Sequence, residues 1–132
     1  MDFLLDTHVL LWSFMSPNKL SSNVKRTFLD PNNTFQVSAI SFWEVSLKYS
    51  LGSLDLKGIN PDEFREYSLD AGFKLLDLST EITSSFYLLP RYRNKDPFDR
   101  MLAWQAMNEK FTLISKDKGF DDYQKEGLKR FW

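Results

Sequence analysis

The chain has 132 residues, a formal net charge of −1, 42% hydrophobic and 16% aromatic residues, and no cysteine. This length and composition indicate one domain, residues 1–132, that can bury a core. The near-neutral charge argues against a protein that coats nucleic acid, although it permits an enzyme with a local basic rim. The lack of cysteine excludes disulfides and thiolate metal sites. Because no apolar run reaches about 18 residues and the N-terminus does not resemble a signal peptide, we expect a cytoplasmic protein without membrane contact.

Strand and helix patterns alternate along the whole chain. The first strand is the apolar run Phe3–Leu5, followed by a mostly apolar helix over 7–15. Further strands are predicted over 34–39, 73–78, 112–115 and 128–132, and further helices from about 21, over 41–51, from 61, from 79 and over 97–108. This alternation predicts an α/β fold in which a mainly parallel sheet is covered by helices on both faces.

The clearest helix begins in the segment Lys95–Met101. Asp96 is expected to cap this helix, and Pro97 suits its first position, where no N–H is needed. Asp99 then falls in the first turn, near the positive end of the helix dipole. Two acids at a helix start need no further role, so any role in chemistry depends on what else lies nearby.

Four acids occupy positions that a parallel sheet would bring together. Asp6 ends the first strand, Asp117 follows the strand over 112–115, and Glu44 and Asp99 lie in the first turns of two helices. Strand ends and helix starts share one edge of such a sheet, where ligands bind. Clustered carboxylates repel one another unless a cation neutralises them. An all-oxygen ligand set favours Mg²⁺ or Mn²⁺, and such a site can activate water to hydrolyse a phosphodiester.

Each acid also has a purely structural explanation. Asp6 can cap the helix that follows it, and Asp117 can belong to a turn. Glu44 fits a capping box with Ser41 and an i,i+4 pair with Lys48. These explanations are independent of one another, whereas a single metal site accounts for all four acids at once.

Four segments together resemble the PIN-domain ribonucleases, specifically the VapC-like toxins of bacterial toxin–antitoxin pairs. In the order and spacing of that family they are Leu4–Trp12, Ser41–Val45, Asp96–Met101 and Leu113–Asp117. The resemblance spans essentially the whole chain. It implies a PIN-like three-layer α/β fold with a central, mainly parallel sheet of about four to five strands and helices on both faces.

The resemblance also assigns roles to the acids. It implies that four residues are catalytic and hold the metal, namely Asp6, Glu44, Asp99 and Asp117, with Asp6 and Asp99 as the principal ligands of Mg²⁺ (or Mn²⁺). Ser41 and Ser115 would support them. His8, the only histidine, is expected to pack or hydrogen-bond within its helix rather than to bind the metal.

The function implied by the resemblance is that of a metal-dependent endoribonuclease. It would cleave RNA with a metal-activated water and leave a 5′-phosphate and a 3′-hydroxyl. The implied partners are a second copy of the chain, in a homodimer, and a small antitoxin that covers the site. The residues alone leave two alternatives open: another metal-dependent phosphohydrolase, and a non-catalytic module whose acidic pocket docks a basic partner.

Basic residues flank the acidic segments and are candidates for RNA binding, because local positive charge holds phosphates. Ordinary solvated surface charge explains Arg91 and Arg93 equally well, but explains Lys95 and Lys116, which lie next to the acids, less well. The candidates are Lys48, Arg91, Arg93, Lys95, Arg100 and Lys116.

Overall fold

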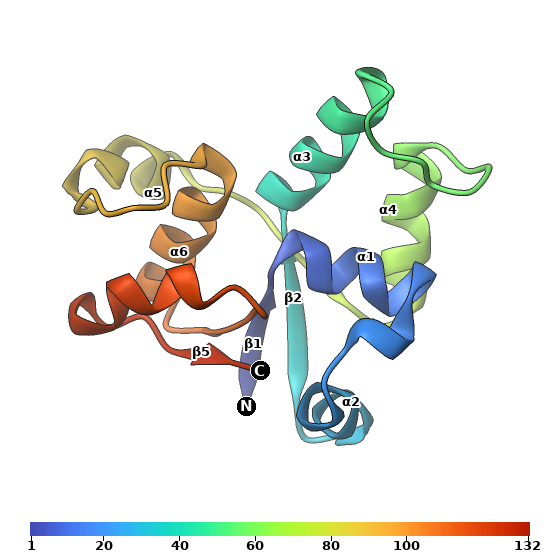
Figure 1. Cartoon of the computed structure of the whole chain (residues 1–132), viewed down its shortest axis with the longest axis horizontal. Coiled ribbons are helices and arrows are strands. Elements are labelled where there is room, and N and C mark those ends of the chain that lie inside the picture. The colour runs from blue at the N-terminus through green and yellow to red at the C-terminus, as the bar shows by residue number, and fades with distance from the viewer.

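The computed structural model describes residues 1–132 and contains one five-stranded sheet whose strands all run parallel (Figure 1). The strands, in the spatial order β3-β2-β1-β4-β5, are β1 (Asp2–Leu5), β2 (Thr34–Ser38), β3 (Lys74–Leu76), β4 (Thr112–Ile114) and β5 (Arg130–Phe131). Leu4 of β1 pairs with Gln36 of β2 and with Leu113 of β4. The predicted parallel sheet of four to five strands is confirmed. Since β1 is the central strand, Asp6 lies at the middle of the carboxyl edge.

Helices cover both faces of the sheet, so the predicted three-layer arrangement is also confirmed. Figure 1 shows α1 to α4 on one side of the central strands and α5, α6 and η3 on the other. The α-helices are α1 (Thr7–Met15), α2 (Ser22–Leu29), α3 (Ala39–Ser50), α4 (Pro61–Asp70), α5 (Thr80–Ser85) and α6 (Pro97–Glu109). The 3₁₀ helices are η1 (Pro17–Lys19), η2 (Phe86–Leu88) and η3 (Lys118–Glu126). None of the helices combines the length and apolar character that a membrane span needs.

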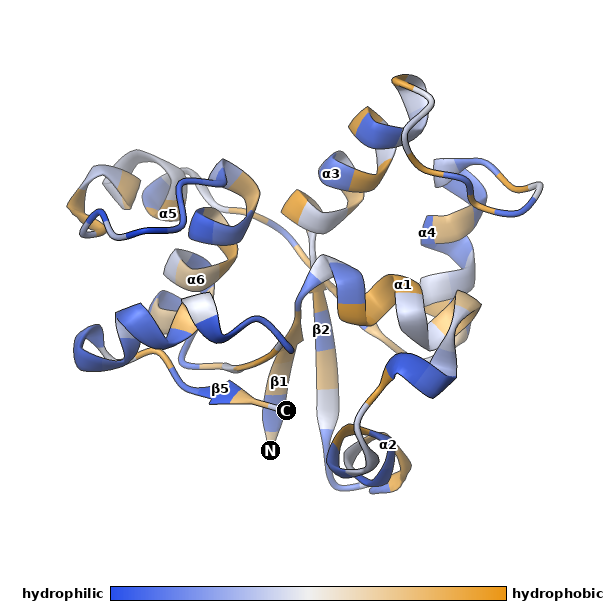
Figure 2. Ribbon diagram, in the orientation of Figure 1, coloured by the Kyte–Doolittle hydropathy of each residue, from blue (hydrophilic) through white to orange (hydrophobic).

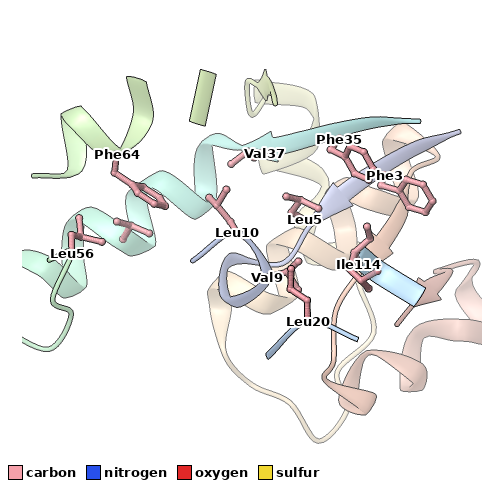
Figure 3. Packing of buried hydrophobic residues seen from close by; sticks show 12 residues of the cluster. Phe3, Leu5, Val9, Leu10, Leu20, Phe35, Val37, Leu56, Phe64 and Ile114 are labelled. Carbon is pink, nitrogen blue, oxygen red and sulfur yellow. The ribbon is translucent and has the colours of Figure 1, made fainter. Parts of the chain in front are cut away.

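The side chains of β1 alternate between two separate hydrophobic cores, one on each face of the sheet. Phe3 and Leu5 are buried on one face with Val9 and Leu10 of α1 (Figure 3). Leu4, on the opposite face, is buried with residues of α6 and η3. Successive side chains of a strand point to opposite faces, so an all-apolar strand is what a sheet covered on both sides requires. Because side chains on both faces of β1 are buried, the position of the strand in the sheet is fixed. The position of Asp6, which follows its last residue, is fixed with it.

Two predicted boundaries were wrong in ways that bear on the site. Helix α3 begins at Ala39, because Ser38 is its N-cap and accepts a hydrogen bond from the Ile40 N–H at 3.1 Å. The predicted capping box between Ser41 and Glu44 therefore does not form. After β4 the sequence predicted only a turn, but η3 follows, and it buries Phe120 and Tyr123.

Candidate metal and nuclease site

Asp6 lies at the centre of the site and is almost fully buried, with 4% of its surface exposed. Its N–H donates to the Ile114 carbonyl at 3.0 Å, which continues the sheet by one residue. One carboxylate oxygen, Oδ2, accepts a hydrogen bond from the Ser115 hydroxyl at 2.8 Å. The other, Oδ1, is buried without any hydrogen-bond partner. Burial raises the pKa of Asp6 and the Glu44 charge adds to this rise, whereas the Ser115 hydrogen bond and the nearby His8 oppose it.

Glu44 is equally buried, at 3% exposed, but it has a cation of its own. The Lys48 Nζ lies 2.5 Å from Glu44 Oε2, one helical turn along α3. The hydrogen bond to Glu44 raises the pKa of Lys48, and the charges of Asp96 and Asp99 contribute further. The i,i+4 pair that the sequence suggested is thus present, and Lys48 faces the acidic residues.

Ser41 connects the helix that carries Glu44 to the helix that follows Asp6. Its hydroxyl is fully buried and accepts a hydrogen bond from the Thr7 Oγ1 at 2.9 Å. Thr7 is the residue next to Asp6, so this bond joins α1 to α3 close to Asp6. Ser41 thus links α1 and α3 through a contact between two hydroxyls.

Asp99 stands at the start of α6, where Asp96 forms the predicted cap. The Asp96 Oδ1 accepts hydrogen bonds from the N–H groups of Phe98, at 2.8 Å, and Asp99, at 3.4 Å. The side chain of Asn94 donates to Asp99 Oδ2 at 2.9 Å. Burial raises the pKa of Asp99 to about 6, and the charges of Asp6, Asp96 and Glu44 contribute to the rise. Asp99 therefore lies close enough to Asp6 and Glu44 to interact with both electrostatically.

A buried polar contact holds α6 against the strand that precedes Glu44. The Ser38 hydroxyl donates to Gln105 Oε1 at 2.5 Å, and Gln105 Nε2 donates to the Asp77 carbonyl at 3.1 Å. Both Ser38 and Gln105 are fully buried. Because Ser38 caps α3 and Gln105 belongs to α6, this contact couples the positions of Glu44 and Asp99.

Asp117 is exposed and serves mainly as the N-cap of η3. Its Oδ1 accepts a hydrogen bond from the Gly119 N–H at 2.8 Å. Its own N–H donates to the Ser115 hydroxyl at 3.0 Å, and this hydroxyl in turn donates to Asp6. Ser115 thus bridges Asp117 and Asp6. The connection to Asp6 runs through the backbone of Asp117, and its carboxylate is engaged in capping.

The predicted convergence of four acids is only partly observed. Asp6, Glu44 and Asp99 interact electrostatically, whereas Asp117 lies at the rim. No three acidic or histidine side chains are close enough together to hold one metal ion. The residues nevertheless fit a hard divalent cation, because Asp6 has a buried oxygen without a partner. Mg²⁺ commonly uses one or two carboxylates and completes its shell with water and substrate oxygens.

Comparison with protein families identifies the fold. The family model described as PIN domain matches residues 3–126. The chain belongs to the PIN domain family. No curated protein sequence matches this PIN domain at a significant level.

Solved structures of the same fold include three protein complexes. VapBC2 from Rickettsia felis, bound to a DNA fragment from its promoter, has a TM-score of 0.68 at 18% identity over 99% of this chain and 98% of that one. FitAcB from Neisseria gonorrhoeae has a TM-score of 0.66 at 19% identity over 98% and 96% of the two chains. DNA-bound VapBC from Salmonella typhimurium has a TM-score of 0.66 at 16% identity over 99% and 97%. At these identities the likeness shows the fold.

The basic residues of this PIN domain differ in how far they are already engaged. Arg91 and Lys95 are exposed in the hydrophilic segment that leads into α6 (Figure 2). In the same segment Arg93 pairs with Asp122 at 3.0 Å. Arg100 donates to the carbonyl oxygens of Leu89 and Pro90, at 3.2 and 3.4 Å. Its guanidinium also lies 4.9 Å from the ring centre of Phe86, so Arg100 has a structural role.

A cavity of about 260 Å³ opens beside Asp6 and was not predicted from the sequence. It is lined by Asp6, His8, Trp12, Lys116 and Asp117. His8 was expected to pack or hydrogen-bond within α1, but its side chain is exposed, with its ring centre 6.0 Å from that of Trp12. The sequence feature that could have indicated this cavity is the i,i+4 spacing of two rings, His8 and Trp12, directly after the Asp6 that ends the first strand.

Proposed function

We propose that this PIN domain is a divalent-metal-dependent endoribonuclease and the VapC-like toxin of a toxin–antitoxin pair. The observation that carries the proposal is the state of Asp6. A buried carboxylate at the ligand-binding edge of a parallel sheet has one oxygen without a partner, and two more acids lie in its field. Buried charge of this kind is costly unless a cation compensates it, and PIN-domain membership supports a nuclease.

Asp6 and Asp99 are the residues that would hold Mg²⁺ or Mn²⁺. When bound, the ion supplies a hydroxide-like water at neutral pH and neutralises the charge that develops on the phosphate. Glu44, neutralised by Lys48, and Asp117, engaged at the start of η3, would shape the surroundings of the ion. In this proposal all four carboxylates contribute to catalysis, two as metal ligands and two through their effect on the surroundings of the ion.

The chain's other residues position the substrate and the acids. Lys116, at the cavity beside Asp6, and the exposed Arg91 and Lys95 are suited to hold RNA phosphates. We leave Arg100 out of the proposed contacts because its guanidinium is engaged within the fold. In the reaction a water oxygen bonds to phosphorus and the bond from phosphorus to the 3′-oxygen breaks. The 3′-oxygen takes up a proton, so the products end in a 5′-phosphate and a 3′-hydroxyl.

We propose two protein partners, a cognate small antitoxin and a second copy of this chain. The antitoxin is supported by the fold's likeness to VapBC and FitAcB complexes. The outer surfaces of α3 and α4 leave large apolar side chains exposed, which is common at sites of protein contact. They include Trp43, which is 60% exposed, and Leu47, Tyr67 and Leu69. Light scattering on purified protein would show a mass of two chains if the homodimer forms.

The test of the activity is RNA cleavage by the purified protein. Wild type should cut RNA with Mg²⁺ or Mn²⁺ and stop when a chelator is added. Asp6→Asn and Asp99→Asn should be folded and inert. Asp70→Asn, a change at an exposed acid at the end of α4, is the matched control and should cut like wild type.

Two outcomes would reject the ribonuclease. If folded Asp6→Asn and Asp99→Asn still cut as well as wild type, the acids are not the catalytic centre. If wild type cuts no RNA under any metal condition but binds a basic peptide tightly, the acidic pocket is a docking site instead.

A further inference from the structure

The cavity beside Asp6 has the chemistry of a nucleobase-binding site. Its volume is about 260 Å³, and its walls combine flat aromatic rings with charged groups. The rings of His8 and Trp12 come from one face of α1, one helical turn apart. Lys116 and Asp117 come from the segment directly after β4. Since β1 and β4 are neighbours at the centre of the sheet, the cavity is built by the same strand ends that position the proposed metal ligand.

Trp12 is held in place by the groups around it. Its ring centre lies 6.1 Å from that of Trp132, the two planes meeting at 63°. The Lys19 Nζ lies 5.7 Å from the same ring. The indole is half-buried and contributes its remaining surface to the cavity. A ring fixed in this way loses little conformational entropy when a second flat ring packs on it.

The charged groups of the cavity include a free cation, Lys116, beside two carboxylates. Lys116 is exposed and takes part in none of the ion pairs of the chain. It can therefore face a phosphate while the rings face the base attached to it. Aromatic stacking of this kind accepts any base, because every base has a flat π-face.

We propose that this cavity binds the base of the nucleotide next to the scissile phosphate, with Trp12 and His8 as stacking surfaces and Lys116 against its phosphate. The inference rests on the proposed ribonuclease function and adds a subsite to it. Its position follows from Asp6, which lines the cavity and also belongs to the metal site. Single-stranded RNA is the substrate class it favours, because only an unpaired base can leave its stack and enter such a cavity.

Photo-crosslinking on the intact protein tests the location. The probe is a twelve-nucleotide single-stranded RNA that contains 5-bromouridine, mixed with wild type in chelator and with Asp99→Asn in Mg²⁺, so that the RNA stays whole. Mass spectrometry should place the crosslink in α1, at His8 or Trp12. Crosslinks found only elsewhere, with α1 unmodified in both proteins, would overturn the subsite.

Binding measurements test the stacking role with oligouridine and oligoadenosine twelve-mers, followed by fluorescence anisotropy. Trp12→Leu keeps apolar volume but removes the π-face, and should weaken binding of both RNAs by roughly 5- to 100-fold. Trp12→Phe should stay within about threefold of wild type because it retains a stacking ring. Tyr87→Leu, at a residue 81% exposed on η2 and not part of the cavity, is the control and should bind normally. Circular dichroism establishes that each variant is folded.

The outcomes separate this inference from the nuclease on which it rests. If wild type cleaves RNA and Trp12→Leu binds and cleaves it with unchanged KM, the subsite is wrong and the ribonuclease stands. If neither wild type nor Asp99→Asn binds either RNA under any metal condition, both proposals fall. If Trp12→Leu keeps its RNA affinity but loses affinity for a basic peptide, the cavity is a peptide-docking site, and the nucleobase assignment is overturned.

Discussion

Asp6 and Glu44 are two carboxylates buried to the same extent at the same edge of the sheet, at 4% and 3% exposed. Their charges are balanced in different ways. Glu44 has a resident cation, because the Lys48 ammonium lies 2.5 Å from it. On Asp6 the Ser115 hydroxyl donates to one oxygen, the other oxygen has no hydrogen-bond partner, and no basic side chain forms an ion pair with either.

The difference indicates which acid needs something from outside the chain. A buried carboxylate with its own lysine is electrostatically complete, whereas one without a cation carries an uncompensated desolvation cost. The state of Asp6 is stable if the carboxyl takes up a proton or if a metal ion binds. We therefore propose that Asp6 ranks above Glu44 as a metal ligand, a ranking that sequence position alone does not provide.

The largest effect is expected from Asp6→Asn. Removal of the principal ligand should lower the rate of RNA cleavage at least about a hundredfold, since even partners of metal ligands cost tenfold or more. The free energy of unfolding of the metal-free variant should match or exceed that of wild type, because a buried charge has been removed. Cleavage assays and denaturant unfolding measure the two quantities. A variant that is both active and less stable would place Asp6 among ordinary structural residues.

Lys48→Met should leave Glu44 in the state that Asp6 has in wild type, buried without an ion-pair partner. The substitution leaves Glu44 buried without its cation and should lower the free energy of unfolding by about 1–2 kcal/mol, less than for a fully buried pair because the Lys48 side chain is 40% exposed. The double variant Lys48→Met/Glu44→Gln should recover most of this loss. Urea denaturation of the single and double variants measures it. Equal stability of Lys48→Met and wild type would mean that water alone compensates Glu44.

The pH dependence of the free energy of unfolding tests whether the pKa of Asp99 is raised in the folded chain. Its pKa is raised from 3.8 to about 6 in the folded chain, so between these values the folded state binds more protons than the unfolded state. The free energy of unfolding of the metal-free protein should therefore fall as the pH rises through this window. Asp99→Asn should remove the part of this fall that Asp99 contributes, while Asp6, whose pKa is also raised, keeps its own part. The variant should be about 1 kcal/mol more stable than wild type at neutral pH after allowance for partial solvent exposure. Thermal unfolding across the pH range should show the two proteins converging toward pH 3.8; parallel curves would contradict the assignment.

Asp117→Asn should have the smallest effect. The asparagine Oδ1 can still accept the Gly119 hydrogen bond that caps η3, and the backbone bond to Ser115 does not depend on the side chain. We expect less than about a tenfold loss of cleavage rate, at the low end for a partner of a metal site. Steady-state kinetics beside Asp6→Asn measures this. A loss as large as that of Asp6→Asn would mean that Asp117 contributes to catalysis as much as Asp6 does, as the family resemblance implies.

The sequence predicted those parts of the site that depend on local signals. An apolar strand that ends in Asp6, and a helix that starts with Asp96 and Pro97, are set by neighbouring residues, and both are present. The helix start at Ser38 was missed because Ser38 reads equally well as the last residue of a strand. It caps α3, and it is held by Gln105, 67 residues away.

Other features depend on contacts that no local pattern reveals. The Thr7–Ser41 hydrogen bond joins residues 34 positions apart, and Arg100 finds its acceptors in the chain before α6. The balance of charge at Asp6 and Glu44 likewise depends on tertiary packing. It determines how far each acid is buried and which side chains reach it.

The most direct test of the proposal that Asp6, rather than Glu44, is a principal metal ligand is calorimetric titration of Mn²⁺ into metal-free wild type, Asp6→Asn and Glu44→Gln. Wild type should bind Mn²⁺, Asp6→Asn should lose this binding, and Glu44→Gln should retain it within a few-fold, because Lys48 already neutralises Glu44. Absence of Mn²⁺ binding to wild type, or its loss in Glu44→Gln but not in Asp6→Asn, would contradict the account.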